Sequence, residues 1–332
     1  MLVGRDVPLR RPGPHELLVR VRAAGVNFAD LVMRQGLYAT VPPRPYSPGF
    51  EVAGEVEEVG TEAAPCKPGD PVVALMRYGG YAERVVVGTN QVFKYPPALS
   101  PALAAAVPVV FLTAWICLFE AARARAGETA LVLGAAGGVG TAAVQLAKSR
   151  GLQVIGTAGG EAKCAFVRNE LGAAACADSR TDWETRVREI AGPRGIDVAL
   201  DPVGGPATAS CRRLLAPLGR LVFFGLSSAI EAGGRNWLRV ARAWLSTPRF
   251  HPYSLVEPNI GVMGVHLLHL GSREGLFAPA LEEIFRGVTA GTWRPIVNRV
   301  FPLTQAGAVA AHRHLHARQN VGKVVLVVKE TA

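Results

Sequence analysis

A glycine-rich turn at residues 131–147 constrains this chain more than any other segment. It reads LVLGAAGGVGTAAVQLA: an apolar strand pattern, a run of glycine and alanine, and a helical pattern without a charged residue. In a dinucleotide-binding turn, the first small residue permits a tight bend, the second lets the backbone approach a pyrophosphate, and the third lets helix pack on strand. Ala135, Gly137 and Gly140 fill these positions, with Ala in place of the first glycine. The phosphates would lie on backbone N–H groups at the helix N-terminus.

The segments around this turn alternate between helix and strand. Strands are expected at 129–134, 153–157, 173–177, 196–201, 219–225 and near 261–268. Helices are expected at 109–124, 138–149, 161–171, 182–191, 205–215 and near 276–287. This alternation predicts a doubly wound parallel sheet, an α/β Rossmann domain. A glycine turn in that context favours a bound dinucleotide over a coincidental match.

The two ends of the chain follow a different pattern. Short β-rich pieces fill residues 16–92, and VNRVFPL, a helix at 304–317 and KVVLVV close the chain. We therefore expect a β-rich domain formed by 1–108 and 292–332, with the nucleotide domain, 109–291, inserted between its two parts. A ligand is expected in the cleft between the domains.

Composition excludes several classes of protein. The chain has 332 residues, of which 49% are hydrophobic, and this indicates a globular protein large enough for two domains. Its formal net charge of +10 would attract anionic partners. The basic residues are scattered, so nucleic acid is not expected as the main partner. Five widely spaced cysteines without a CxxC pair indicate reduced thiols, and the N-terminus lacks the apolar core of a signal peptide, so we expect a cytoplasmic protein. The uncharged stretch 97–119 is interrupted by prolines and is interpreted as a buried helix pair rather than a transmembrane segment.

The end of the second Rossmann strand bears on the choice of dinucleotide. NAD-binding chains place an acidic residue there to bind the ribose hydroxyls. This strand ends with Thr157 and small residues, and Glu161 follows two glycines later, where an acid is common at a helix start. Lys163 and Arg180 are candidate cations for a 2′-phosphate. NADPH is therefore favoured, with NADH as the alternative.

A second segment, NFADLVMRQGLY at 27–38, has two interpretations. Asn27 is a good helix N-cap, Asp30 suits the first turn, and Gly36 is a good stop, so capping alone explains the pattern. The same residues can also face a cleft.

Taken together, the motifs resemble a known family across nearly the whole chain. They are GVNFADLVMRQGLY, PYSPGFEVAGEVEEVG, LTAWICLF, the AAGGVG turn, DPVGG and NVGKVVLVV. In this order they resemble the medium-chain dehydrogenase/reductase superfamily and, within it, the zinc-independent quinone oxidoreductase (zeta-crystallin-like) branch. Two further segments, GRNWLRVARAW at 234–244 and GVHLLHL at 264–270, resemble the vesicle amine transport protein 1 subgroup of that branch. The resemblance implies a GroES-like catalytic domain with an inserted Rossmann domain.

The resemblance also bears on metal binding. Zinc-dependent members supply a catalytic Cys where this chain has Asn27, and a His where it has Phe50. No metal is therefore expected. His312, His314 and His316 are interpreted as surface histidines, since alternate helix positions face different sides.

The site residues follow from the resemblance. Asn27 and Tyr38 would border the nicotinamide and substrate as the catalytic pair. The cofactor-binding residues implied are Thr113, Ala136, Gly137, Gly138, Val139, Gly159, Lys163, Arg180, Gly225, Leu226, Arg318 and Asn320. The implied reaction is hydride transfer from NADPH to a quinone or an α,β-unsaturated carbonyl, in a homodimer. Two alternatives stay open: a non-catalytic NADP-binding, membrane-associated protein, and an enoyl-thioester reductase.

Overall fold

The computed structural model describes residues 2–38, 42–63, 66–230, 234–271 and 275–329. The chain divides into two compact units, one formed by residues 1–112 and 268–332 and the other by 113–267. The first unit is therefore built from both ends of the chain. The sequence analysis expected an inserted domain at 109–291, whereas the second unit ends at 267.

The first unit is organised around one sheet of seven strands. Its strands are β1 (Glu16–Val26), β2 (Glu51–Val59), β3 (Pro71–Leu75), β4 (Arg84–Gly88), β5 (Val92–Lys94), β12 (Val297–Pro302) and β13 (Lys323–Val327). The order is β12-β13-β1-β2-β3-β5, with β4 also paired to β1. β1 has antiparallel neighbours in β2, β4 and β13, so both of its edges are paired, and all but three of its eleven residues are buried.

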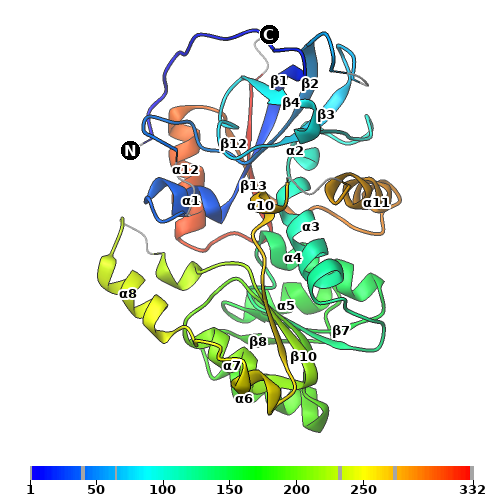
Figure 1. The fold of residues 1–332 in the computed structure, drawn as a ribbon, viewed down its shortest axis with the longest axis vertical. Coiled ribbons are helices and arrows are strands. Elements are labelled where there is room, and N and C mark those ends of the chain that lie inside the picture. The colour runs from blue at the N-terminus through cyan, green and yellow to red at the C-terminus, as the bar shows by residue number, and fades with distance from the viewer. Residues whose placement is uncertain (1, 39–41, 64–65, 231–233, 272–274, 330–332) are drawn as a thin grey trace. The chain divides into compact units, whose positions relative to one another are not determined.

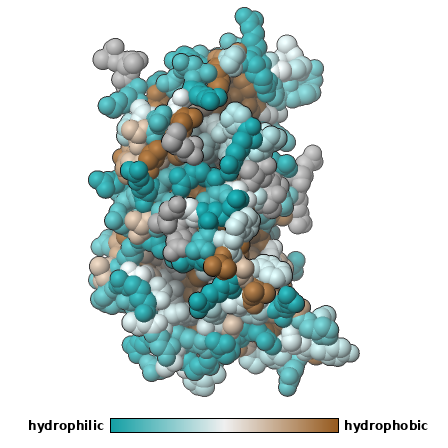
Figure 2. Space-filling model, turned by 90° about the vertical axis from the view of Figure 1, so that its left-hand side faces the viewer, coloured by the Kyte–Doolittle hydropathy of each residue, from teal (hydrophilic) through white to brown (hydrophobic). Residues whose placement is uncertain are grey.

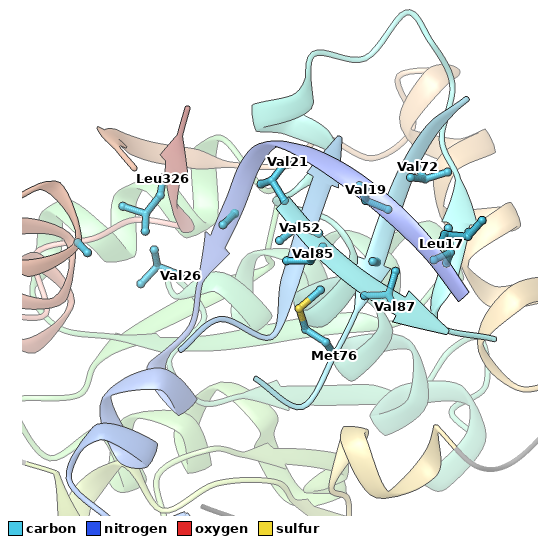
Figure 3. Close-up of a cluster of buried hydrophobic side chains, with 14 of the residues drawn as sticks. Leu17, Val19, Val21, Val26, Val52, Val72, Met76, Val85, Val87 and Leu326 are labelled. Atoms are coloured by element: carbon cyan, nitrogen blue, oxygen red, sulfur yellow. The ribbon is translucent and has the colours of Figure 1, made fainter. Parts of the chain in front are cut away.

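β-branched side chains form the core of this unit. Val21, Val52 and Val85 come from three different strands and pack together with Met76 and Leu326 (Figure 3). The alternation of apolar and polar residues along these short strands directs one face inward, which is the physical basis of the β-rich pattern in the sequence.

Short helices complete the first unit. They are α1 (Phe28–Arg34), η1 (Thr89–Gln91), α2 (Pro101–Ala104), α11 (Phe277–Thr289) and α12 (Gln305–His316). α3 (Pro108–Trp115) and α10 (Leu267–Leu270) cross the two boundaries between the units. The Phe285 ring on α11 lies 6.4 Å from that of Tyr95, which ties this helix to the β-rich unit.

The second unit holds a six-stranded sheet, whose strands β7, β8 and β10 are labelled in Figure 1. Its strands are β6 (Thr129–Val132), β7 (Gln153–Ala158), β8 (Ala175–Asp178), β9 (Ile196–Asp201), β10 (Leu215–Phe223) and β11 (Gly261–Gly264). They are all parallel, in the order β11-β10-β9-β6-β7-β8. Numbered along the chain, this is the 3-2-1-4-5-6 order of the doubly wound dinucleotide-binding fold. The predicted parallel Rossmann sheet is confirmed.

η2 (Ile116–Ala121) precedes the first strand of this sheet. The helices that connect the strands are α4 (Gly138–Ser149), α5 (Glu161–Asn169), α6 (Trp183–Ala191), η3 (Gly192–Arg194), α7 (Pro206–Leu214), η4 (Ser227–Ala229), α8 (Trp237–Ser246) and α9 (Tyr253–Val256). The strand order reverses between β6 and β9, so the carboxyl ends of these two strands mark the position where such sheets bind ligands.

One apolar stretch in the described part of the chain, Pro101–Ala121, is long and apolar enough to span a membrane. It consists of α2, α3 and η2, and 78% of its most apolar window is buried within the protein. Such burial is typical of a core helix.

Candidate active site

The glycine turn lies between β6 and α4 in the second unit. Gly134 has a φ of +64°, in the left-handed region that glycine tolerates. A Cβ on Gly140 would overlap the Gly134 carbonyl oxygen and lie 2.7 Å from the Ala135 Cα. Gly140 therefore allows helix and turn to touch. Sequence analysis selected Gly137 and Gly140 but passed over Gly134, whose only signal is its place one residue before the motif.

The first turn of α4 presents backbone N–H groups that have no partner within the helix. They belong to Gly138, Val139 and Gly140, which follow the N-cap residue Gly137. Gly138 and Val139 are partly exposed. The helix dipole adds partial positive charge here, so the turn suits an anion such as a diphosphate.

Thr157 at the end of β7 holds the turn from the side. Its hydroxyl accepts a hydrogen bond from the Gly134 N–H at 3.3 Å, and its carbonyl accepts one from the Ala135 N–H at 2.8 Å. The Thr157 residue is 2% exposed. The side chain at the usual ribose-binding position is therefore engaged in supporting the glycine turn.

Arg180 and Gly160 are close neighbours beyond the end of β7. Gly160 has a φ of +96°, and a Cβ there would overlap the Arg180 guanidinium. Asp178 holds both residues: Oδ1 accepts from the Gly160 N–H at 2.8 Å and from the Arg180 N–H at 3.0 Å, and it also pairs with the Arg180 side chain. The backbone and side-chain hydrogen bonds of Arg180 keep the Asp178 pKa below its usual value.

Glu161, the alternative ribose ligand, has another partner. Its carboxylate forms an ion pair with Arg168 at 2.5 Å on the same helix. Lys163 lies on the first turn of α5, next to Gly160, and is partly exposed. Lys163, Gly159 and Arg180 therefore belong to one region of the second unit.

The loop after β9 is organised by a carboxylate that the sequence analysis did not select. Asp201 is fully buried; its Oδ1 accepts from the N–H groups of Val203 and Gly204 at 2.7 and 3.0 Å, and its Oδ2 accepts from the Thr208 hydroxyl at 2.6 Å. Burial raises the Asp201 pKa. This loop lies beside the glycine turn, because β9 pairs with β6. The DPVGG motif was the available signal.

Gly225 and Leu226 follow the neighbouring strand, β10. A Cβ on Gly225 would lie 2.9 Å from the Pro202 carbonyl oxygen, so the two loops pack closely. Both residues are partly exposed at the carboxyl end of the sheet. Thr113, in α3 at the start of this unit, is 7% exposed.

In the first unit, Asn27 stands at the N-cap of α1. The Asp30 N–H donates to the Asn27 carbonyl oxygen at 3.0 Å, and Asp30 Oδ2 accepts from the Asn27 N–H at 2.8 Å. These bonds use the Asn27 backbone and leave its carboxamide to other partners. Capping therefore does not account for the Asn27 side chain.

The Asn27 carboxamide lies between two buried charged groups. Its Nδ2 donates to Glu51 Oε1 at 2.8 Å, and its Oδ1 accepts a hydrogen bond from the Lys323 ammonium. Lys323 Nζ and Glu51 Oε1 are 2.5 Å apart, with side-chain exposures of 3% and 0%. The other oxygen, Glu51 Oε2, accepts from the Val109 N–H at 2.7 Å. Sequence analysis did not select Glu51 or Lys323 as site residues.

A second buried network starts at Asp30. Its Oδ1 accepts from the Gly49 N–H at 2.8 Å, and its Oδ2 accepts from the Tyr81 hydroxyl at 3.2 Å. Burial raises the Asp30 pKa to about 6, against the opposing effect of these donors. The Tyr81 oxygen lies 3.1 Å from His312 Nε2, and burial lowers the His312 pKa to about 3.

His312 corrects a sequence-based interpretation. It was expected at the surface with His314 and His316, but it is completely buried. The structure places it on the core side of α12, where it contacts Tyr81. A buried hydrogen-bonding partner takes the place of solvent for its polar ring.

Tyr38 follows α1 and is partly buried. Its ring centroid lies 5.5 Å from that of Phe50, the residue before Glu51. Burial raises the Tyr38 pKa to about 12, so its hydroxyl keeps its proton at neutral pH and serves as a hydrogen-bond donor.

The donor set around Asn27 does not fit zinc. Structural and catalytic zinc sites need three or four Cys, His or carboxylate ligands. Within the residues that the structure describes, no group of three or more such side chains is placed to hold a metal. The Asn27 amide and the Phe50 ring stand where zinc-dependent relatives have Cys and His ligands. The Lys323 ammonium already neutralises the Glu51 carboxylate.

The predicted site residues are divided between the two units. The second unit contains Thr113, Ala136, Gly137, Gly138, Val139, Gly159, Lys163, Arg180, Gly225 and Leu226. The first contains Asn27, Tyr38, Arg318 and Asn320. Arg318, with a φ of +52°, and Asn320, which donates to the Gly322 carbonyl at 2.8 Å, lie between α12 and β13.

Comparisons with known proteins agree with this two-part organisation. Residues 13–97 match the alcohol dehydrogenase GroES-like domain, and residues 138–266 match the zinc-binding dehydrogenase family. The GroES-like and Rossmann domains predicted from the sequence are both confirmed.

Relatives along the whole chain refine the assignment. A synaptic vesicle membrane protein VAT-1 homolog from Danio rerio is 38% identical over 95% of this chain, which spans 64% of that protein's length. A quinone oxidoreductase from Rattus norvegicus is 31% identical, with 97% of this chain and 92% of the relative covered. The crystal structure of Escherichia coli quinone oxidoreductase complexed with NADPH superimposes with a TM-score of 0.84 at 29% identity, covering 97% and 94% of the two chains. The chain therefore belongs to the medium-chain dehydrogenase/reductase superfamily, in the branch that contains the VAT-1 homologs and the quinone oxidoreductases.

Proposed function

We propose that this protein is an NADPH-dependent, zinc-independent reductase that transfers hydride to quinones or α,β-unsaturated carbonyls. One observation carries the proposal: the chain combines a dinucleotide-type glycine turn with a polar cluster that does not fit zinc. Where zinc-dependent relatives have a zinc ligand, this chain has the Asn27 carboxamide, bonded to the charged side chains of Glu51 and Lys323. The family relatives support the same reaction class.

Residues of the second unit hold the cofactor in this proposal. The N–H groups of Gly138 and Val139, which follow the N-cap residue Gly137, receive the diphosphate, and Arg180 with Lys163 receives the 2′-phosphate. Thr113, Gly225 and Leu226 contact the nicotinamide end, and Arg318 or Asn320 is a further cofactor-binding residue in this proposal. NADPH supplies the hydride.

Asn27 and Tyr38 act on the substrate side. Both are neutral donors at physiological pH, and they orient the acceptor carbonyl and the nicotinamide amide. Hydrogen-bond donors polarise a carbonyl less than a metal does, so the proposed acceptors are those that are already electrophilic. Quinones and activated enones have this property.

The test is NADPH oxidation with three panels of acceptors: 9,10-phenanthrenequinone, 2-alkenals and an enoyl thioester. We expect turnover with the first or second panel. Binding of NADPH without turnover on any panel overturns the enzymatic proposal, and turnover on the thioester alone assigns the protein to enoyl-thioester reduction. Stoichiometric zinc in the purified protein overturns the zinc-independent part.

The proposal includes a homodimer located in the cytoplasm. Light scattering after size-exclusion chromatography measures the first, and fractionation of the source cells measures the second. A monomer, or a protein recovered only with membranes, contradicts the respective part.

α8 favours a second candidate function, association with a membrane surface. Its outward face carries four large apolar side chains that are 60–85% exposed: Trp237, Leu238, Trp244 and Leu245. In the space-filling view of this side, apolar side chains reach the surface among hydrophilic ones (Figure 2). The segment 235–249 contains four arginines and no acidic residue. A basic helix with exposed aromatic residues is suited to anionic lipid surfaces.

Liposome co-sedimentation tests this second candidate. We expect binding to vesicles with phosphatidylserine that weakens with salt and with substitution of Arg235, Arg239 and Arg242. Equal recovery with neutral and anionic vesicles excludes it.

A further inference from the structure

We infer that Lys323 and Glu51 are positioning residues that fix the orientation of the Asn27 carboxamide. The inference rests on the proposed role of Asn27 beside nicotinamide and substrate. It concerns two residues that touch neither of them in the proposal and act through Asn27.

The sheet brings these three side chains together at one end. β1 ends at Val26, β2 begins at Glu51, and β13 begins at Lys323. β1 lies between its two antiparallel neighbours, β2 and β13, with Val26 opposite Val324. Asn27, the next residue along the chain, is therefore at the level of Lys323, while Glu51 approaches from the other neighbour. The backbone accommodates this approach at Gly25, where a Cβ would lie 2.7 Å from the Glu51 carboxyl carbon.

Hydrogen-bond polarity then selects one orientation of the amide. A lysine ammonium only donates hydrogen bonds, and an ionised carboxylate only accepts them. Oδ1 of Asn27 therefore faces Lys323, and Nδ2 faces Glu51, as in the structure. A rotation of the amide by half a turn would set its NH₂ against the ammonium and its oxygen against the carboxylate. Both contacts become repulsive in a buried environment.

This arrangement leaves a defined donor for chemistry. An asparagine amide carries two N–H groups, and Glu51 receives one of them. The second N–H has a fixed direction as long as both charged partners hold the amide. A misplaced donor at a reacting centre costs about 10- to 100-fold in rate.

Replacing both members of the Lys323–Glu51 pair with neutral side chains tests the inference. Breaking a buried ion pair on one side leaves an uncompensated charge, whereas neutralising both sides is often tolerated. The variant is therefore Glu51→Gln with Lys323→Met. The Glu51→Gln side chain keeps one oxygen, which can accept from Asn27 or from the Val109 N–H but not from both, and the two charges that select the amide orientation are gone. Asp70→Asn with Lys94→Met, which removes a partly exposed lysine–carboxylate pair of the same unit at 2.8 Å, is the control.

The first measurement is a double-mutant cycle on kcat and KM. We expect the Glu51→Gln/Lys323→Met protein to lose about 10- to 100-fold in kcat, with its dissociation constant for NADPH within about threefold of wild type. Addition of Asn27→Ala then causes no further loss, because the pair acts through Asn27. Wild-type kcat in the folded double variant, or losses that multiply in the triple variant, overturn the inference. Loss of kcat in the Asp70/Lys94 control overturns it as well.

A second measurement does not depend on turnover or on the variant's folding. The NMR signals of the Asn27 side-chain amide, assigned with Asn27→Ala, report whether the amide is held. We expect the two amide protons to exchange slowly with solvent in the wild-type protein, because Glu51 and Lys323 hold the buried carboxamide. Exchange as fast as that of a solvent-exposed asparagine side chain overturns the inference. The wild-type signals can show a held amide while the Asn27→Ala protein keeps full activity. In that case the proposed role of Asn27 fails, but its positioning by Lys323 and Glu51 stands.

Discussion

Lys323 and Glu51 are separated by 272 residues in sequence, yet Nζ of the first lies 2.5 Å from Oε1 of the second. Both side chains are almost completely buried. The pair lies in the β-rich unit, where Glu51 begins β2 and Lys323 begins β13. Both side chains form hydrogen bonds with the carboxamide of Asn27, which follows the end of β1. Burial without solvent makes the hydrogen bonds directional and strong, so the geometry of Asn27 depends on both partners.

Substitution of Gly140 tests the glycine turn. A Cβ at Gly140 overlaps the Gly134 carbonyl, so we expect Gly140→Ala to lower the free energy of unfolding by about 1–3 kcal/mol. The affinity for NADPH falls as well, since the turn must open. Thermal unfolding and fluorescence titration measure the two effects. Gly264→Ala, where no atom lies within 4 Å of the added Cβ, is the control and changes stability by less than about 0.5 kcal/mol. Equal effects of the two substitutions contradict the predicted packing.

Arg180 tests the choice between NADPH and NADH. If Arg180 binds the 2′-phosphate as proposed, we expect Arg180→Met to raise the dissociation constant for NADPH about 10- to 100-fold, because a charged hydrogen bond is lost. The dissociation constant for NADH stays the same. Arg168→Met removes the neighbouring arginine that pairs with Glu161 and serves as control. A parallel loss for both dinucleotides shows that Arg180 supports the fold of the loop and does not read the phosphate.

Asp201 tests the loop beside the glycine turn. Asp201→Ala leaves two backbone N–H groups and the Thr208 hydroxyl without their buried acceptor, so we expect a loss of about 2–4 kcal/mol in the free energy of unfolding. Asp201→Asn retains one oxygen for the backbone groups, and its loss is about half as large or less. Chemical denaturation of both variants provides the comparison. Similar losses for Ala and Asn point to the charge, and not the accepted hydrogen bonds, as the stabilising feature.

His312 tests the buried network on α12. Its folded pKa of about 3 lies below the ordinary value of 6.5, so the unfolded chain binds a proton that the folded protein excludes. Stability from this group is present above pH 6.5 and is lost as the pH falls towards 3, by at most about 1.4 kcal/mol per pH unit. We expect His312→Gln to remove this component, while His314→Gln on the same helix keeps it. Denaturation curves between about pH 7.5 and pH 4 measure the slopes, and identical slopes for wild type and His312→Gln refute the prediction.

Local sequence patterns predicted most of the Rossmann unit. The strand at 196–201 was predicted with the bounds that the structure shows, and the helix at 138–149 matches α4. A glycine turn, a strand and a helix are decided within a few residues, so spacing and backbone sterics suffice. The division between the units was harder, because α11 has a helical pattern in either unit and only its packing on Tyr95 places it.

Local sequence patterns could not predict contacts between side chains that are far apart in the sequence. His312 was expected at the surface because helix periodicity gives its face but not the partner of that face, Tyr81, 231 residues away. Asp30 was interpreted as a first-turn acid, which is correct, but its bonds to Gly49 and Tyr81 depend on the fold.

The sequence by itself determined the glycine turn and the parallel doubly wound sheet, since both depend on short-range spacing, and its motifs carried the resemblance to the family. Only the tertiary structure decided what surrounds Asn27. Pairing of β1 with β2 and β13 sets the register that brings residues 27, 51 and 323 to one buried point. Register follows from the burial of many side chains at once, and no local signal encodes it.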